Sequence, residues 1–156
     1  MIARWEQGRA TIDALLADRR LERVAPSREV ADLLIGQARR HLTTAEAAAD
    51  RDPTAGFQVA YDAARKALTA ILANQGLRPR GDGAHAVLLT AALAQLGPPM
   101  GRDLRHFDWL RRTRNGAEYP LPDTPPVTAD DVNDALPLAK TIVAIAERVI
   151  PNMPVY

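Results

Sequence analysis

Apolar residues recur at every third or fourth position along most of the chain, which is the spacing of one face of an α-helix. The clearest example covers residues 27–50, and its apolar face consists of Val30, Leu33, Leu34, Ala38, Leu42, Ala45 and Ala49. Ser27 precedes this face, and a serine in that place accepts a hydrogen bond from the first turn of a helix. The pattern therefore predicts an amphipathic helix that begins directly after Ser27.

A second amphipathic helix is predicted over residues 53–75. Asp52 is suited to the N-cap, and Pro53 suits the first helical position because no N–H is needed there. Gly76 is suited to the end of the helix, where a left-handed backbone is common. The apolar face of this helix consists of Phe57, Tyr61, Ala64, Leu68, Ile71 and Leu72.

Two shorter helices are predicted after this pair, over residues 84–96 and from about Asp103 to Glu118, because Gly97 and Pro120 interrupt the pattern there. An N-terminal helix that ends before Pro26 is predicted from the spacing of Ile2, Trp5, Ile12, Leu15 and Leu16. The helical pattern therefore continues along the sequence both before and after the two helices predicted over residues 27–50 and 53–75.

The last helix is predicted to follow Thr128, which has the spacing of a capping box with Asp131. Pro137 either kinks this helix or delays its regular part until after Asp134. No stretch has a convincing strand pattern. The sequence therefore predicts a single all-α domain, an up-and-down bundle of about five to six helices. Residues 1–25 would be an N-terminal helix added to a bundle over residues 27–151.

Composition narrows the possible functions. The chain has 156 residues, of which 47% are hydrophobic and 25% are charged, as in one soluble domain. No apolar run approaches the roughly 20 residues that cross a bilayer, and charges interrupt the first ten residues. We therefore expect a cytoplasmic protein with no membrane partner.

The residue types also limit the chemistry. The chain has no cysteine and 3 histidines, which excludes thiolate chemistry and leaves little for a metal site. No phosphate-binding loop, HExxH or dinucleotide motif occurs, so we expect no metal and no cofactor. The net charge of +1 excludes no partner, because the local distribution of charge decides nucleic acid binding.

The stretch RRTRNGAEYP, residues 111–120, carries the densest candidate chemistry. Arg114 follows Leu110 by four residues, which places its charge on the apolar face of the helix. Asn115 and Tyr119 are also four apart, so the polar groups could converge into a small phosphate site. Alternatively, Arg114 pairs with Glu118 and the stretch is an ordinary solvated helix end.

Other candidates for contact with phosphate or RNA lie nearby. Arg111 and Arg112 flank Arg114 in an arginine-rich helix, and Trp109 lies off its apolar face, as an aromatic residue at an interface does. Arg65, on the helix over residues 53–75, is most simply part of a solvated face with local ion pairs. In a paired bundle it would add to a basic cleft.

The three histidines are interpreted as structural. Arg80 and His85 are five positions apart, but a glycine-rich loop separates them, and we interpret this spacing as a coincidence. His106 lies about two turns before Arg114, where it could line the cleft at a distance, and is interpreted as an exposed helix residue. His41 is interpreted as a residue at the edge of the core that pairs with a neighbour.

The string from Arg114 to Tyr119 resembles the signature of HEPN domains, in which an arginine and a polar residue are followed, about three residues later, by a histidine. The stretch AYDAARKAL over residues 60–68 resembles the corresponding helix of small bacterial HEPN proteins. The resemblance implies a helical bundle that pairs as a homodimer and brings both motifs into one cleft. Many members are metal-independent endoribonucleases, often the toxins of toxin-antitoxin pairs.

Carried onto this chain, the resemblance implies that Arg114 binds the scissile phosphate and that Asn115 orients it. The family's histidine falls on Tyr119, and a tyrosine with a pKa near 10 is a poor base at neutral pH. Nearby arginines could lower that pKa, or Tyr119 could only donate a hydrogen bond. It could also accept a nucleotide from a partner nucleotidyltransferase.

Two hypotheses follow for a function of this stretch, beside a third in which the protein is purely structural and Arg114 is exposed to solvent. The first is a basic cleft for RNA phosphate at a homodimer interface, in a metal-independent endoribonuclease or a toxin with a cognate antitoxin. Its catalytic residues would be Arg114, Asn115 and Tyr119. The second is a catalytically silent HEPN-like module that binds RNA or another protein through the same cleft.

Overall fold

The computed structural model describes residues 5–156, so the predicted helical position Ile2 lies outside the described part. The helices and strands, in chain order, are α1 (Arg9–Ala17), β1 (Leu21–Arg23), α2 (Arg28–Ala48), α3 (Pro53–Gln75), β2 (Leu77–Pro79), α4 (Ala84–Leu96), α5 (Gly101–Glu118), α6 (Ala129–Val149) and the 3₁₀ turn η1 (Ile150–Asn152). The prediction of an all-α bundle is confirmed, because six of these elements are α-helices and the only sheet among the described residues has two short strands.

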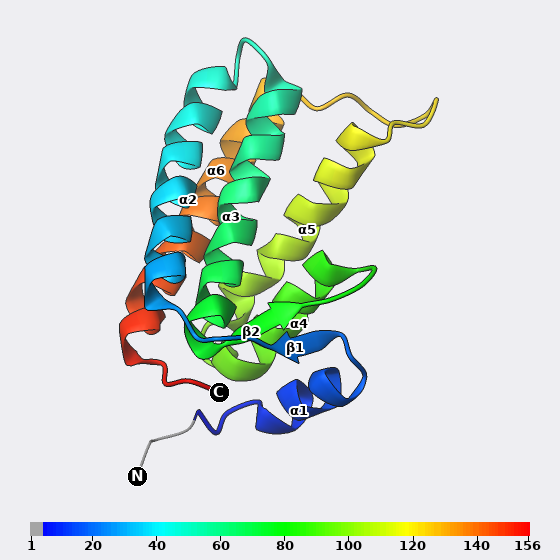
Figure 1. Ribbon diagram of the computed structural model, residues 1–156. Coiled ribbons are helices and arrows are strands. Elements are labelled where there is room, and N and C mark those ends of the chain that lie inside the picture. Colours follow the sequence, from blue (N-terminus) through cyan, green and yellow to red (C-terminus); the bar gives the residue numbers. More distant parts are fainter. Residues whose placement is uncertain (1–4) are drawn as a thin grey trace.

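The helices α2, α3, α5 and α6 run along the length of the molecule, whereas α1 and α4 lie at its lower end (Figure 1). The helix α3 occupies the centre, and its contact face is made largely of alanine. Ala60, Ala63, Ala64, Ala67 and Ala70 are all fully buried. Small side chains let neighbouring helices approach closely, so α3 packs against α2, α5 and α6.

The predicted helix boundaries in this central part are confirmed. The side chains of Ser27 and Asp52 each accept a backbone hydrogen bond at the start of their helices, and Thr128 forms the capping box that starts α6. Gly76 ends α3 with a positive φ of 82°, and a Cβ there would lie 2.9 Å from the carbonyl oxygen of Val24. Glycine is therefore required where the chain leaves α3.

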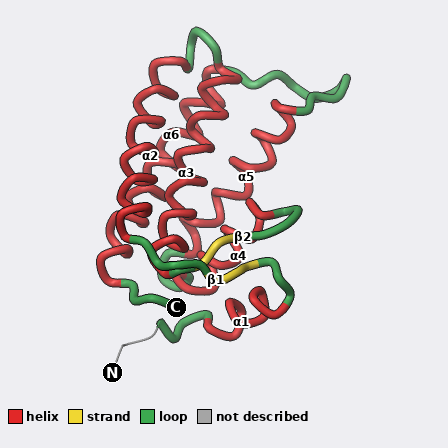
Figure 2. Tube along the Cα trace, viewed as in Figure 1, coloured by secondary structure: helices red, strands yellow, loops and turns green. Residues whose placement is uncertain are grey.

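The prediction that the chain has no strands was wrong. The strands β1 and β2 pair antiparallel, with Glu22 opposite Arg78, and appear as the two yellow segments of Figure 2. Their side chains form an ion pair across the ribbon. Three residues are too few to show an alternating pattern, and the partners come together only because α1 and α4 are packed at the same end of the bundle.

The predicted face of α2 was also partly wrong. Val30 and Leu33 are 44% and 58% exposed, while Ala31 and Ile35 are buried. The packing of α2 against α3 and α6 selects the side that is buried. Apolar character alone therefore misplaced the face in the first two turns of α2, whereas Ala38, Leu42, Ala45 and Ala49 are buried as predicted.

Two smaller corrections concern helix starts. The helix α5 begins at Gly101, two residues before the predicted Asp103. The helix α6 runs without interruption from Ala129 and contains Pro137, so its start is not delayed until after Asp134. The capping box at Thr128 supplies the partners for the first turn, which fixes the start ahead of the proline.

Candidate functional site

The middle of α5 faces α3, as the apolar spacing predicted. Leu110 is fully buried, and one turn later the guanidinium of Arg114 lies over the ring of Tyr61 at 5.8 Å from its centroid. A cation over an aromatic face is attracted by the electron density of the ring. The ring of Tyr61 in turn stacks on Phe107, with 5.4 Å between centroids. Two aromatic rings therefore support Arg114 from the core side.

Arg114 differs from its neighbours in its charge partners. Arg65 pairs with Asp62, and Arg111 pairs with Asp108, each at 2.8 Å. Within residues 5–156, the one side-chain hydrogen bond of Arg114 goes to the amide oxygen of Asn115, at 3.3 Å, and no carboxylate lies within ion-pair distance.

The alternative in which Arg114 pairs with Glu118 is therefore not realised in this part of the chain. A half-buried guanidinium without a carboxylate has lost part of its hydration and still has N–H groups free to donate. The arrangement favours binding of an anion at Arg114.

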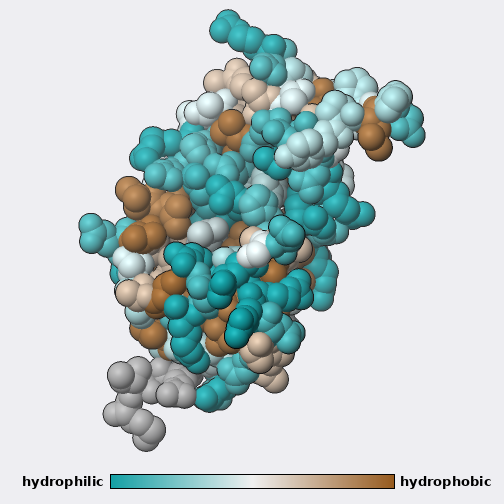
Figure 3. Space-filling view, turned by 45° about the vertical axis from the view of Figure 1, so that its right-hand side comes forward, coloured by the Kyte–Doolittle hydropathy of each residue, from teal (hydrophilic) through white to brown (hydrophobic). Residues whose placement is uncertain are grey.

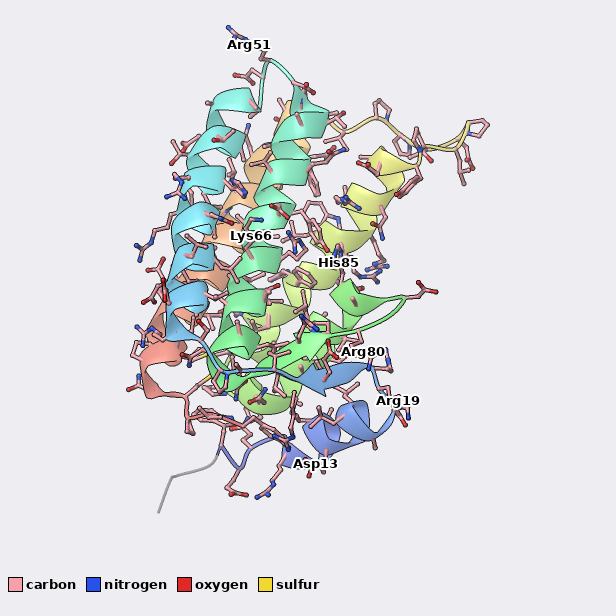
Figure 4. All side chains as sticks on the ribbon, in the orientation of Figure 1. Asp13, Arg19, Arg51, Lys66, Arg80 and His85 are labelled. Carbon is pink, nitrogen blue, oxygen red and sulfur yellow. The ribbon has the colours of Figure 1, made fainter. Side chains whose placement is uncertain are left out.

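Arg114 lies in an open groove of about 250 Å³ between α3 and α5, called here the arginine groove. It is lined by Gln58, Val59, Tyr61, Asp62, Arg65, His85 and Arg114. Figure 4 shows His85 beside α5, above the two short strands, and Lys66 on α3. The groove therefore combines two arginines with an imidazole ring.

His85 is the functional candidate that sequence reasoning missed. Its Nδ1 lies 2.9 Å from the hydroxyl of Tyr61, which is 24 residues away along the chain. Arg80, whose spacing from His85 had suggested a motif, pairs instead with Glu22 at 3.6 Å. The interpretation of that spacing as a coincidence holds for Arg80. No local pattern could have placed His85 beside Arg114, because the loop before α4 brings it there.

Both rings of this pair stay uncharged at neutral pH. Burial lowers the pKa of His85 below 6.5, and the charges of Arg65 and Arg114 lower it further. Burial also raises the pKa of Tyr61 to about 12. His85 is therefore a neutral imidazole that can accept a proton, and Tyr61 is a phenol that keeps its own.

A second groove, of about 360 Å³, lies on the other side of His85 and is called here the loop groove. It is lined by Gly81, Asp82, Gly83, Ala84, His85, Ala86, Arg111 and Asn115. The candidates Arg111 and Asn115 therefore border one side of His85, and Arg65 and Arg114 border the other. The structure brings four of the predicted site residues around one unpredicted histidine.

The wall of the arginine groove on α3 is held by Asp62, which contacts the side chains of a histidine, a lysine and an arginine. Its carboxylate lies 3.2 Å from His41 and 3.1 Å from Lys66, and it also pairs with Arg65. Burial alone would raise the pKa of Asp62, but the hydrogen bonds and charges of Arg65 and Lys66 hold it below its usual value. The prediction that His41 pairs with a neighbour is confirmed, and Arg65 is fixed along the groove.

Three predicted site residues lie elsewhere. Tyr119 follows the last turn of α5, is 73% exposed and lines neither groove. Trp109 packs edge-on against Phe57, with 5.5 Å between centroids. Trp109 and Arg112 line a separate hollow of about 490 Å³ beside the loop at Pro125, called here the proline groove.

The surface around α5 is mainly hydrophilic. Figure 3 turns this side of the molecule forward and shows polar residues over most of it, with separate apolar patches. His106 is exposed on α5, as predicted. In the described part of the chain, no helix combines the length and the apolar character needed to cross a membrane.

Comparison with known families gives one match. The model of the HEPN domain matches residues 31–149, a range that includes α3, α5 and every residue of both grooves. Comparisons with curated proteins and with solved structures gave no match. The family match spans most of the 156 residues and agrees with the helical architecture. The chain therefore belongs to the HEPN domain family.

Proposed function

We propose that the arginine groove binds a backbone phosphate of RNA, with Arg114 as its principal contact. The observation that carries this proposal is the half-buried guanidinium of Arg114, which no carboxylate neutralises within residues 5–156. Arginine suits this role because its planar fork of N–H groups can donate two parallel hydrogen bonds to phosphate oxygens.

Arg65 adds a second positive charge across the groove. Its pairing with Asp62 at 2.8 Å leaves other N–H groups of the guanidinium able to donate. Beyond His85, the loop groove continues the same surface past Arg111 and Asn115. A strand of RNA bound along both grooves would place successive phosphates near different arginines, while Asn115 orients the phosphate at Arg114.

We further propose that two copies of the chain pair and bring both arginine grooves into one cleft. Membership of the HEPN family supports this arrangement, because the resemblance implies a homodimer with both motifs at the interface. Light scattering tests it by measuring the mass of the particle. A mass of twice 17.0 kDa agrees with the proposal, and a monomer that binds RNA with full affinity contradicts it.

The reaction that this cleft supports best is metal-independent cleavage of RNA. Arginine beside a neutral imidazole suits phosphoryl transfer, because one stabilises negative charge and the other moves a proton. A second function is favoured by one observation: Tyr119, at the place of the motif's histidine, is 73% exposed. If the imidazole of His85 moves no proton either, the cleft binds RNA and does not cut it.

Binding of a fluorescent single-stranded RNA tests the shared part of both functions. Arg114→Ala removes a charge-assisted contact worth about 1.5–3 kcal/mol, so we expect the Kd to rise by about 10- to 100-fold. Arg102→Ala is the matched control, because Arg102 is on the same helix with a side chain that is 91% exposed. Equal affinity of the two variants would exclude Arg114 as the phosphate contact.

A further inference from the structure

We propose that His85 is the catalytic residue that accepts the proton of the ribose 2′-hydroxyl in RNA cleavage, and that Tyr61 is its positioning residue. This inference rests on the proposed RNA function of the arginine groove. It assigns the proton-transfer role to the start of α4, outside the motif on α5 in which Tyr119 occupies the histidine position.

The place of His85 carries the proposal. Its ring borders both grooves, so RNA that binds along them must pass it. In the described chain, Nδ1 is the ring nitrogen with a hydrogen-bond partner, the hydroxyl of Tyr61 at 2.9 Å. The other ring nitrogen, Nε2, is therefore available to contact a bound ligand. The proposed base is the tautomer in which Nδ1 carries the hydrogen and donates it to the hydroxyl oxygen of Tyr61, because Nε2 then has the free electron pair that a general base needs.

Tyr61 links the base to the phosphate site. Its side chain is 2% exposed, one face of its ring stacks on Phe107, and the guanidinium of Arg114 lies over the ring. A tyrosine held in this way has little freedom to move. The same residue therefore supports the proposed phosphate contact and orients the imidazole ring, so both groups keep a fixed geometry before RNA binds.

The charged groups around His85 favour its neutral form. They come from both helices packed against it and are Asp62 and Arg65 of α3 and Arg111 and Arg114 of α5. Three positive charges against one negative charge disfavour an imidazolium. Burial acts in the same direction, and the pKa of His85 is lowered from 6.5. A base with a pKa below neutrality is free to accept a proton at the pH of the cell.

The reaction that follows is an internal transfer at phosphorus. Nε2 of His85 removes the proton of the 2′-hydroxyl, and the 2′-oxygen forms a bond to the adjacent phosphorus. The bond from phosphorus to the 5′-oxygen breaks, and that oxygen takes a proton from water. The imidazolium gives its proton to the hydroxide that remains. The products are a 2′,3′-cyclic phosphate and a 5′-hydroxyl, with Arg114 stabilising the charge on the phosphorane.

The test compares RNA cleavage and RNA binding in the same full-length variants, in buffer with a metal chelator. We expect His85→Gln to lower kcat by about 10²- to 10⁴-fold, the contribution typical of general acid–base catalysis, with an unchanged Kd for RNA. His106→Gln is the matched control, because His106 is exposed on α5. Circular dichroism confirms that each variant is folded.

The pH dependence adds a readout that a structural role of His85 would not change. In the wild type, kcat/KM should rise with pH through a midpoint below 6.5, the pKa of an unperturbed histidine, and stay level above it, because kcat/KM reports the free protein. Tyr61→Phe removes the oriented hydrogen bond and should lower kcat by about 2- to 12-fold with little change in KM. The midpoint should be absent from the residual activity of His85→Gln.

Each outcome decides between the two proposals. Cleavage by His85→Gln at the wild-type rate overturns the role of His85 and leaves the RNA function in place. Arg114-dependent binding without any cleavage by the wild type also overturns it and identifies an RNA-binding module. If the wild type binds RNA no better than Arg114→Ala does, the proposed function fails and the role of His85 fails with it.

Discussion

The end of α5 and the start of α4 offer opposite surroundings for a group that exchanges protons. At the end of α5, Tyr119 has the position at which the resemblance to HEPN domains implies a histidine, and its side chain is 73% exposed. At the start of α4, His85 is half-buried and lies 2.9 Å from the hydroxyl of Tyr61. In this chain, the residue at the motif position, Tyr119, is therefore not the residue that lies beside the arginines, which is His85.

This difference shows what fixes the site. The positions of Arg114 and Asn115 could be predicted from the sequence, because both residues belong to a regular helix with about 3.6 residues per turn. The groove is determined by α3, which supplies Tyr61, and by the start of α4, which supplies His85. In our proposal, His85 from α4 therefore takes the proton-transfer role that the resemblance implies for the position of Tyr119.

The largest expected effect is on cleavage of RNA. Tyr119→Phe removes the hydroxyl at the motif position and should change kcat by less than about twofold, whereas His85→Gln should lower it by about 10²- to 10⁴-fold. Initial rates on one fluorescent RNA measure both variants. A larger loss of kcat in Tyr119→Phe than in His85→Gln would mean that Tyr119, and not His85, transfers the proton.

A large difference is also expected in stability. Phe107 is fully buried and stacks on Tyr61, so Phe107→Ala should lower the free energy of unfolding by about 3–5 kcal/mol. Tyr119→Ala at the exposed end of α5 should lower it by about 0.5 kcal/mol or less. Urea denaturation measures both values. Similar losses in the two variants would mean that Tyr61 is not held by a rigid support.

A moderate effect is expected on the salt dependence of RNA binding. Arg114→Gln should reduce the slope of log K against log salt by about 0.7–1, because one phosphate contact is lost. Glu118→Gln, one turn nearer to Tyr119, should leave the slope nearly unchanged. Anisotropy titrations at several salt concentrations measure it. A slope that Arg114→Gln does not change would place the phosphate contact elsewhere.

The smallest expected effect concerns stability against pH. The pKa of His85 is lowered in the folded chain, so the unfolded chain binds the proton more readily. The stability due to neutral His85 is present above about pH 6.5 and is lost as the pH falls through the lower folded pKa. Between neutral and mildly acidic pH, the Tm of the wild type should therefore fall further than the Tm of His85→Gln. An equal fall in Tm for both proteins would show that folding leaves the pKa of His85 unchanged.

Much of the fold could be predicted from the sequence, because local rules determine it. Ser27, Asp52, Gly76 and Thr128 mark helix ends through hydrogen bonds or backbone angles within a few residues. The inward position of Arg114 followed from its spacing from Leu110. The family followed from the same stretch of α5, and the HEPN match agrees with it.

The remaining features depend on contacts between distant parts of the chain. Glu22 and Arg78 pair across the ribbon although 56 residues separate them. His85 reaches Tyr61 only because a glycine-rich loop turns α4 toward the bundle. The exposed side of α2 likewise depends on which helices cover it. Such contacts leave no periodic signal in a single sequence.

The most direct test of the account is an NMR titration of the histidine rings with RNA that is 2′-O-methylated throughout and cannot be cleaved. The chain has 3 histidines, His41, His85 and His106, so each signal can be assigned by substitution. We predict that RNA shifts the His85 signals in the wild type, leaves those of the exposed His106 in place, and shifts nothing in Arg114→Ala at the same concentration. RNA that binds the wild type without shifting His85 would contradict the account.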